Sequence, residues 1–155
     1  PVRIVVSRAM KVSSQSQLAR TSDQVPVWLC HGAGVDVAGW TDQGAISLPC
    51  ATTAGTVDPT DAMRVLADQG ITRVFCEGGG MLAASLLNAG LVDRLVVFSA
   101  GCAIGAEGTP MLAAMGVSRL HDAPKFVLEN VRQIGADTCH TWRRLPTPDV
   151  GVAGK

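Results

Sequence analysis

The chain has 155 residues, of which 47% are hydrophobic, and its 13 basic residues balance 13 acidic ones. This length and composition predict one folded domain with a substantial buried core. A neutral chain has no net field to recruit nucleic acid or an anionic membrane, and no apolar run is long enough to span a bilayer. Five widely spaced cysteines without a CxxC pair argue against a disulfide framework and against a metal cluster, and they favour a reducing cytoplasm.

The first part of the chain contains short apolar runs of the kind that form buried strands. They are residues 2–6 (VRIVV), 27–30 (VWLC) and, more weakly, 45–48 (AISL). The polar stretch between the first two runs is predicted to be a loop. Gly32 and Gly34 follow the second run, but Val37 stands where a dinucleotide-binding fingerprint needs its third glycine, so that fingerprint is rejected.

The middle of the chain predicts helices alternating with strands. Residues 58–70 (DPTDAMRVLADQG) carry helix signals: Asp58 or Thr60 as N-cap, Pro59 near the start, Asp61 in the first turn and Gly70 past the end. Then come a predicted strand at 71–77 (ITRVFCE), a buried helix at 81–90 (MLAASLLNAG) and a strand at 91–100 (LVDRLVVFSA). This alternation predicts parallel strands joined by a right-handed crossover.

The last part of the chain predicts an antiparallel hairpin. Two extended runs, 125–135 and 137–145, flank the turn residues Gly135 and Ala136. The fold class is therefore α/β, with a mixed, mainly parallel sheet and a C-terminal antiparallel hairpin. We expect residues 1–146 to form the domain and residues 147–155 to be a flexible tail.

The stretch EGGG (77–80) lies between a predicted strand and a predicted helix, where open α/β sheets bind ligands. Free N–H groups at a helix start favour an anion such as phosphate, and glycine lets the anion approach the backbone. Glu77, itself negative, would instead accept hydrogen bonds from a sugar or an amine. The alternative is that the glycines only form a tight turn. The apolar helix behind them favours a ligand, because a buried helix presents its N-terminus into a cleft.

Residues 77–98 (EGGGMLAASLLNAGLVDRLVVF) resemble the signature of the reductase domain of the bifunctional riboflavin-biosynthesis deaminase/reductase family. The similarity continues through 103–112 (AIGAEGTPML) and 120–142, and 1–8 (PVRIVVSR) resembles a strand of that family. The resemblance implies a dihydrofolate-reductase-like, three-layer fold. It also implies NADPH-dependent reduction of 5-amino-6-(5-phosphoribosylamino)uracil to the ribitylamino compound, by hydride transfer to the ribose C1′ in its opened, imine-like form.

The resemblance also implies site residues and partners. Glu77 matches a position that touches substrate, and no residue is assigned as a catalytic proton donor. The stretch that matches the family's NADPH contacts comprises Gly79, Gly80, Met81, Leu82, Ala83, Ala84 and Ser85. Family members often form homodimers, and the apolar C-terminal hairpin is a candidate interface through Phe126, Val127, Leu128 and Val131.

The chain also departs from the family pattern. Arg8 stands at a strand end where the family usually has serine, and we hypothesise that it pairs with the 2′-phosphate of NADPH; the alternative is a solvated arginine. The family's SLDG segment and DDP-L-x-R loop have no counterpart here, so we expect them upstream, with a zinc deaminase domain further upstream still. Two rival functions are a related oxidoreductase for another pterin or pyrimidine, and a non-catalytic nucleotide-binding or dimerisation module.

Overall fold

The computed structural model describes residues 1–145 and divides the chain into two compact units, Pro1–Phe75 and Cys76–Lys155. Each unit is considered by itself. The tail predicted at residues 147–155 lies outside the described residues, and the single domain over 1–146 stays a prediction. Within the described part of the chain, none of the helices has the length and apolar content that a membrane crossing requires.

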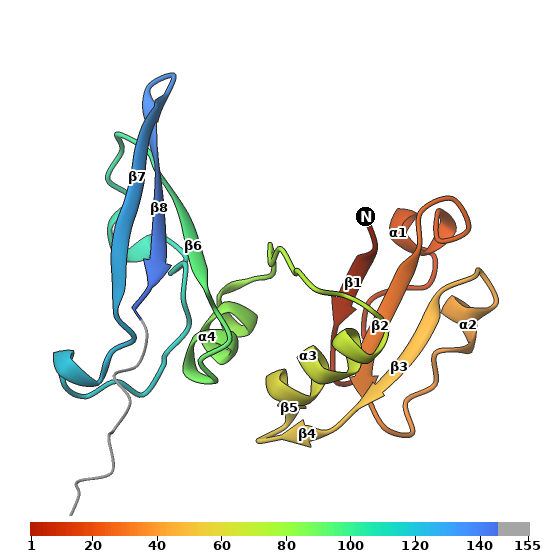
Figure 1. Cartoon of the computed structure of the whole chain (residues 1–155). Helices are drawn as coiled ribbons and strands as arrows, with labels where there is room; N and C mark the ends of the chain where they lie inside the picture. The colour runs from red at the N-terminus through yellow and green to blue at the C-terminus, as the bar shows by residue number, and fades with distance from the viewer. Residues whose placement is uncertain (146–155) are drawn as a thin grey trace, which may run out of the picture. The chain divides into compact units, whose positions relative to one another are not determined.

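The sheet of the first unit has three parallel strands, β1 (Arg3–Val6), β2 (Val27–Gly32) and β3 (Ile46–Cys50), in the order β1-β2-β3 (Figure 1). All three apolar runs predicted as strands are confirmed. A short antiparallel pair, β4 (Thr52–Thr53) and β5 (Thr56–Val57), follows β3 directly. Because Gly32 pairs with Cys50 in the register of β2 and β3, the carboxyl ends of these strands lie side by side.

Three helices belong to this unit: α1 (Gln17–Arg20), α2 (Ala38–Thr41) and α3 (Pro59–Asp68). The single turn of α1 lies inside the stretch predicted as a loop, where the Ser16 hydroxyl accepts the Ala19 N–H and so caps it. The helix predicted at 58–70 is confirmed as α3, with Asp58 as its N-cap. Hydrophobic clusters form around Leu29 with Trp40, and around Cys30 and Leu48 with Leu66 of α3.

The second unit combines one long helix with an antiparallel sheet (Figure 1). Helix α4 (Gly80–Asn88) precedes β6 (Arg94–Ser99), and two 3-10 turns, η1 (Gly105–Glu107) and η2 (Leu120–Asp122), lead to the hairpin of β7 (Phe126–Ile134) and β8 (Asp137–Arg144). The strand order is β6-β8-β7. The predicted hairpin is confirmed, and Gly135 at its turn adopts a left-handed φ of 63°.

Two expectations for the middle of the chain are wrong. The segment 71–77 contains no strand, and most of its side chains are exposed. Apolar, β-branched residues favour extended backbone, but a strand forms only when it is hydrogen-bonded to a neighbouring strand. Among the described residues, no strand pairs with this segment. The second strand does form as β6, yet it pairs antiparallel with β8 rather than parallel to an earlier strand.

Candidate functional site

A cleft opens at the carboxyl edge of the parallel sheet in the first unit. Its volume is ≈ 260 Å³, and it is lined by Arg8, Gly32, Ala33, Val35, Cys50, Ala51 and Thr52. These residues come from the segments that follow β1, β2 and β3 or end them. Ligands of parallel α/β sheets bind at this edge, because the loops that leave the strands converge there.

Gly32 allows the ends of the strands to come together. Its N–H donates to the carbonyl oxygen of Arg8 at 3.1 Å. A Cβ at this position would lie 3.0 Å from the same oxygen and 3.2 Å from Cγ2 of Thr52. Both distances are shorter than an ordinary van der Waals contact of a Cβ atom. Glycine is therefore needed here for close approach, and the contact fixes the backbone of Arg8 at the mouth of the cleft.

Charge in the cleft favours an anion. The side chain of Arg8 is exposed and is the one charged group among the lining residues, and within residues 1–145 no carboxylate lines the cleft or pairs with this guanidinium. A guanidinium binds phosphate through two parallel hydrogen bonds when nothing else occupies it. The structure thus shows Arg8 as an exposed lining residue of this cleft, and its role in binding phosphate stays a prediction.

The thiols and the histidine near the cleft offer no nucleophile. Burial raises the pKa of the Cys30 thiol to about 12, and burial likewise raises the pKa of Cys50. Both thiols therefore stay protonated near neutral pH, whereas a nucleophilic cysteine must be a thiolate. His31 is buried, with Nδ1 2.8 Å from the carbonyl oxygen of Gly32 and Nε2 2.8 Å from the Ser47 hydroxyl. Because both ring nitrogens have partners, His31 is a core residue.

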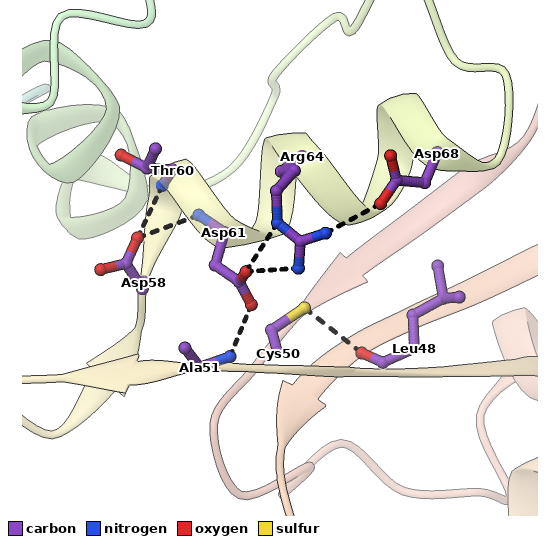
Figure 2. A network of polar contacts seen from close by, with 8 residues as sticks. All are labelled: Leu48, Cys50, Ala51, Asp58, Thr60, Asp61, Arg64 and Asp68. Atoms are coloured by element: carbon purple, nitrogen blue, oxygen red, sulfur yellow. Dashed lines mark hydrogen bonds and ion pairs between the residues drawn. The ribbon is translucent and has the colours of Figure 1, made fainter.

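The wall of the cleft is tied to the N-terminus of α3 (Figure 2). The N–H of Ala51 donates to Oδ2 of Asp61 at 2.7 Å, and the carbonyl oxygen of Ala51 accepts the N–H of Asp58 at 2.8 Å. Arg64 bridges Asp61 and Asp68, at 2.7 Å and 2.9 Å. Sequence analysis recognised Asp61 only as a favourable charge in the first turn of a helix, since its bond to Ala51 is a tertiary contact.

The glycine run in the second unit has two different roles. Gly80 is closely packed: a Cβ there would lie 3.0 Å from the carbonyl oxygen of Met111, and Ala113 donates its N–H to Gly80 at 3.1 Å. Gly79 is the N-cap of α4, and no described atom lies within 4 Å of the place its Cβ would take. None of the three glycines has a left-handed φ, so the backbone path alone does not require them. The packing of Gly80 supports the turn interpretation, whereas the open space at Gly79 leaves the helix start accessible.

The other predicted site residues of this stretch differ in their exposure. Glu77 precedes the glycines and is exposed, and Met81 is 70% exposed. Ala84 is buried, and the hydroxyl of Ser85 donates to the carbonyl oxygen of Met81 at 3.0 Å, inside the helix. Arg8 belongs to the first unit and this stretch to the second. The residues that line the cleft at Gly32, Cys50 and Thr52 were missed, although each closes or follows an apolar strand pattern.

Comparison with protein-family models matches residues 1–140 to the RibD C-terminal domain. The riboflavin biosynthesis protein RibD of Escherichia coli (strain K12) is 29% identical over 139 residues, which cover 90% of this chain and 37% of that protein. The 5-amino-6-(5-phosphoribosylamino)uracil reductase of Buchnera aphidicola subsp. Acyrthosiphon pisum (strain APS) is 29% identical over 75 residues, which cover 48% of this chain and 36% of that protein. The chain thus spans little more than a third of the length of these relatives.

A solved structure shows the same fold. Acinetobacter baumannii RibD, form 2, superposes with a TM-score of 0.78 at 19% sequence identity, over 94% of this chain and 38% of that one. The predicted α/β, dihydrofolate-reductase-like class with parallel and antiparallel strands is confirmed. The resemblance noted between residues 77–98 and the riboflavin-biosynthesis reductase domain is confirmed as well.

Proposed function

The chain belongs to the RibD C-terminal domain family, and we propose that it acts as a reductase in riboflavin biosynthesis. The observation that carries this proposal is the match over residues 1–140, combined with a relative whose name specifies 5-amino-6-(5-phosphoribosylamino)uracil reduction. The proposed substrate is that phosphoribosylamino-pyrimidine, and the proposed product is its ribitylamino counterpart.

The proposed cofactor is NADPH, which would supply the hydride that reduces the sugar carbon. The cleft of the first unit suits one end of this dinucleotide rather than the whole, because its ≈ 260 Å³ is smaller than typical ligand pockets, which enclose about 300–1,000 Å³. Two observations support phosphate binding there: Arg8 lines the cleft, and the absence of carboxylates among the lining residues of the described chain removes a source of repulsion. Arg8 is therefore proposed as the partner of the 2′-phosphate.

The start of α4 is proposed as the second contact with the cofactor. The open position of Gly79 lets a ligand approach the helix N-terminus, and the residues proposed to lie against NADPH are Gly79, Gly80, Met81, Leu82, Ala83, Ala84 and Ser85. The exposed carboxylate of Glu77 is proposed to accept hydrogen bonds from substrate hydroxyl or amino groups. Within this set, Met81 in the first turn of α4 has the exposure that direct contact needs, whereas Ala84 is packed in the unit itself.

A deaminase domain and a second copy of the chain are proposed as further partners. The matched part of this chain covers only 37% of the Escherichia coli relative and 38% of the Acinetobacter baumannii protein. We propose that the reductase works alongside a zinc deaminase domain in the parent protein, in the cytoplasm. Homodimerisation is proposed through the hairpin of β7 and β8, where Leu128 and Val131 are both exposed.

The proposal is tested by titrating the purified protein with NADPH and with NADH, following nicotinamide fluorescence, and by assaying turnover of the phosphoribosylamino-pyrimidine. We expect saturable NADPH binding and substrate-dependent oxidation of NADPH. Arg8→Ala should weaken NADPH more than NADH, while Arg20→Ala, which removes another exposed arginine of the same unit, should change neither. Equal losses for both nucleotides would remove Arg8 from the 2′-phosphate site. Binding without turnover in the full-length protein would favour a nucleotide-binding module.

A further inference from the structure

The N-terminus of α3 holds Ala51 through two hydrogen bonds, of which Figure 2 shows the one to Asp61. The N–H of Ala51 donates to the carboxylate of Asp61, and its carbonyl oxygen accepts the N–H of Asp58. Ala51 lies in the gap between β3, which ends at Cys50, and β4, which begins at Thr52. The Asp61 carboxylate therefore gives this N–H the partner that a longer strand would have provided.

The segment held in this way is one wall of the cleft that contains Arg8. Cys50, Ala51 and Thr52 all line the cleft, and Cγ2 of Thr52 lies 3.2 Å from the place that a Cβ of Gly32 would take. A shift of Ala51 would move these neighbours with it, because they are joined to it by planar peptide bonds. The hydrogen bond between Asp61 and Ala51 thus helps to position the Cys50–Thr52 wall of the cleft that Arg8 also lines.

The charge of Asp61 is partly offset by Arg64, which also pairs with Asp68. Arg64 donates to Oδ1 of Asp61 from two of its nitrogens, at 2.7 Å and 3.2 Å, while Oδ2 accepts the Ala51 N–H. The Ala51 N–H and the Arg64 guanidinium hold the pKa of the Asp61 carboxyl below its ordinary value, so it is an anion at neutral pH. With Arg64 beside it, this anion repels a bound phosphate less than an unpaired carboxylate would.

We infer that Asp61 is a positioning residue, which fixes the Cys50–Thr52 wall through the N–H of Ala51 and thereby sets how tightly the cleft binds the phosphate-bearing end of a nucleotide. This inference rests on the proposed function, because it assumes that NADPH occupies the cleft. Asp61 is not proposed to touch the ligand.

The helix supplies a matched control. Asp68 has the same charge, lies on the same helix and pairs with the same Arg64 at 2.9 Å, but it does not contact Ala51. Asp61→Ala and Asp68→Ala therefore both remove one carboxylate and one ion pair, and only the first removes the hydrogen bond to the N–H of Ala51. Asp61→Asn keeps an oxygen that can accept the Ala51 N–H and removes the charge.

The experiment measures dissociation constants for NADPH and NADH in the wild type and the three variants, and amide hydrogen exchange at Ala51. We expect Asp61→Ala to weaken NADPH by about three- to tenfold, the range a hydrogen bond to a charged group accounts for once part of it is replaced by water. NADH should weaken less, exchange at Ala51 should speed up, Asp68→Ala should match the wild type, and Asp61→Asn should restore most of the affinity.

The outcomes separate this inference from the proposed function. If the wild type binds NADPH and the two alanine variants lose affinity equally, or neither loses any, the positioning role is overturned while the reductase proposal stands. Faster exchange at Ala51 with unchanged affinity also overturns it, since the wall would then be loose without consequence for binding. A wild type that binds neither nucleotide overturns the proposed function and this inference together.

Discussion

The N–H of Gly32 donates a hydrogen bond to the carbonyl oxygen of Arg8 at 3.1 Å. The carboxyl end of β2 therefore lies directly against the residue that brings positive charge to the cleft. We predict that Gly32→Ala destabilises the protein by about 1–3 kcal/mol, the usual cost of forcing an extra carbon into a packed site. Both atoms that the new Cβ would meet belong to cleft residues, at 3.0 Å in Arg8 and 3.2 Å in Thr52. Urea denaturation measures the change.

Gly101→Ala is the control for this substitution, because its Cβ would have open space among the described atoms and its φ is not left-handed. It should leave the free energy of unfolding within about 0.5 kcal/mol of the wild-type value, as surface substitutions do. Equal midpoints for the two variants would show that the strand ends are not closely packed at Gly32.

The cap of α3 should make the protein sensitive to acid. The N–H of Asp61 and the hydroxyl of Thr53 hold the pKa of the Asp58 carboxyl below its ordinary value of 3.8. A lowered pKa in the folded state means that this carboxylate stabilises the fold fully above that value, and the contribution is lost as the pH falls through the folded pKa. We predict that stability declines below about pH 4 and that Asp58→Asn, which still caps the helix, shows a shallower decline.

Circular dichroism at 222 nm during urea titrations between pH 7 and pH 3 measures this difference. Asp58→Asn and the wild type should be close in stability at pH 7, since asparagine and aspartate are comparable N-caps. Parallel curves over the whole range would mean that Asp58 does not titrate differently in the folded and unfolded chain.

Sequence reasoning succeeded where the signal is local. Asp58 and Pro59 mark the start of α3 by their own chemistry, and Gly135 marks the hairpin turn because few other residues adopt its left-handed φ. The three strands of the parallel sheet could be predicted for a similar reason, since buried strands are apolar throughout. In each case the residues that carry the signal are also the residues that form the element.

Prediction failed where a partner distant in sequence decides the outcome. Residues 71–77 have the composition of a strand, but no strand pairs with them among the described residues. Strand β6 pairs with β8, which lies more than thirty residues later in the chain. The link from Asp61 to Ala51 spans ten residues across a hairpin, and the approach of Gly32 to Arg8 spans a whole strand connection. The apolar pattern and the capping signals contain no information about such pairs, so of the residues that line the cleft only Arg8 was predicted.

Burial should divide the cysteines by reactivity. Cys102 is exposed, whereas Cys30 is fully buried and its pKa is raised to about 12. Since the thiolate is the reactive form, we predict that iodoacetamide at pH 8 modifies Cys102 in the native protein and leaves Cys30 unmodified until urea unfolds the chain. Peptide mass spectrometry after timed quenching distinguishes the two sites. Similar rates at Cys30 and Cys102 under native conditions would show that the core of the parallel sheet opens readily.

The proposed homodimer depends on one face of the hairpin. Leu128 and Val131 pair with Trp142 and His140 of β8, and residues paired across antiparallel strands share a face, so the two apolar side chains lie together. They are 46% and 48% exposed, an unfavourable arrangement unless another surface covers them. We predict that Val131→Asp shifts the protein from dimer to monomer by burying a charge in the interface, as measured by sedimentation velocity. Arg132→Asp, on the opposite face of β7, should leave the dimer intact; a dimer that survives both substitutions must use a different surface.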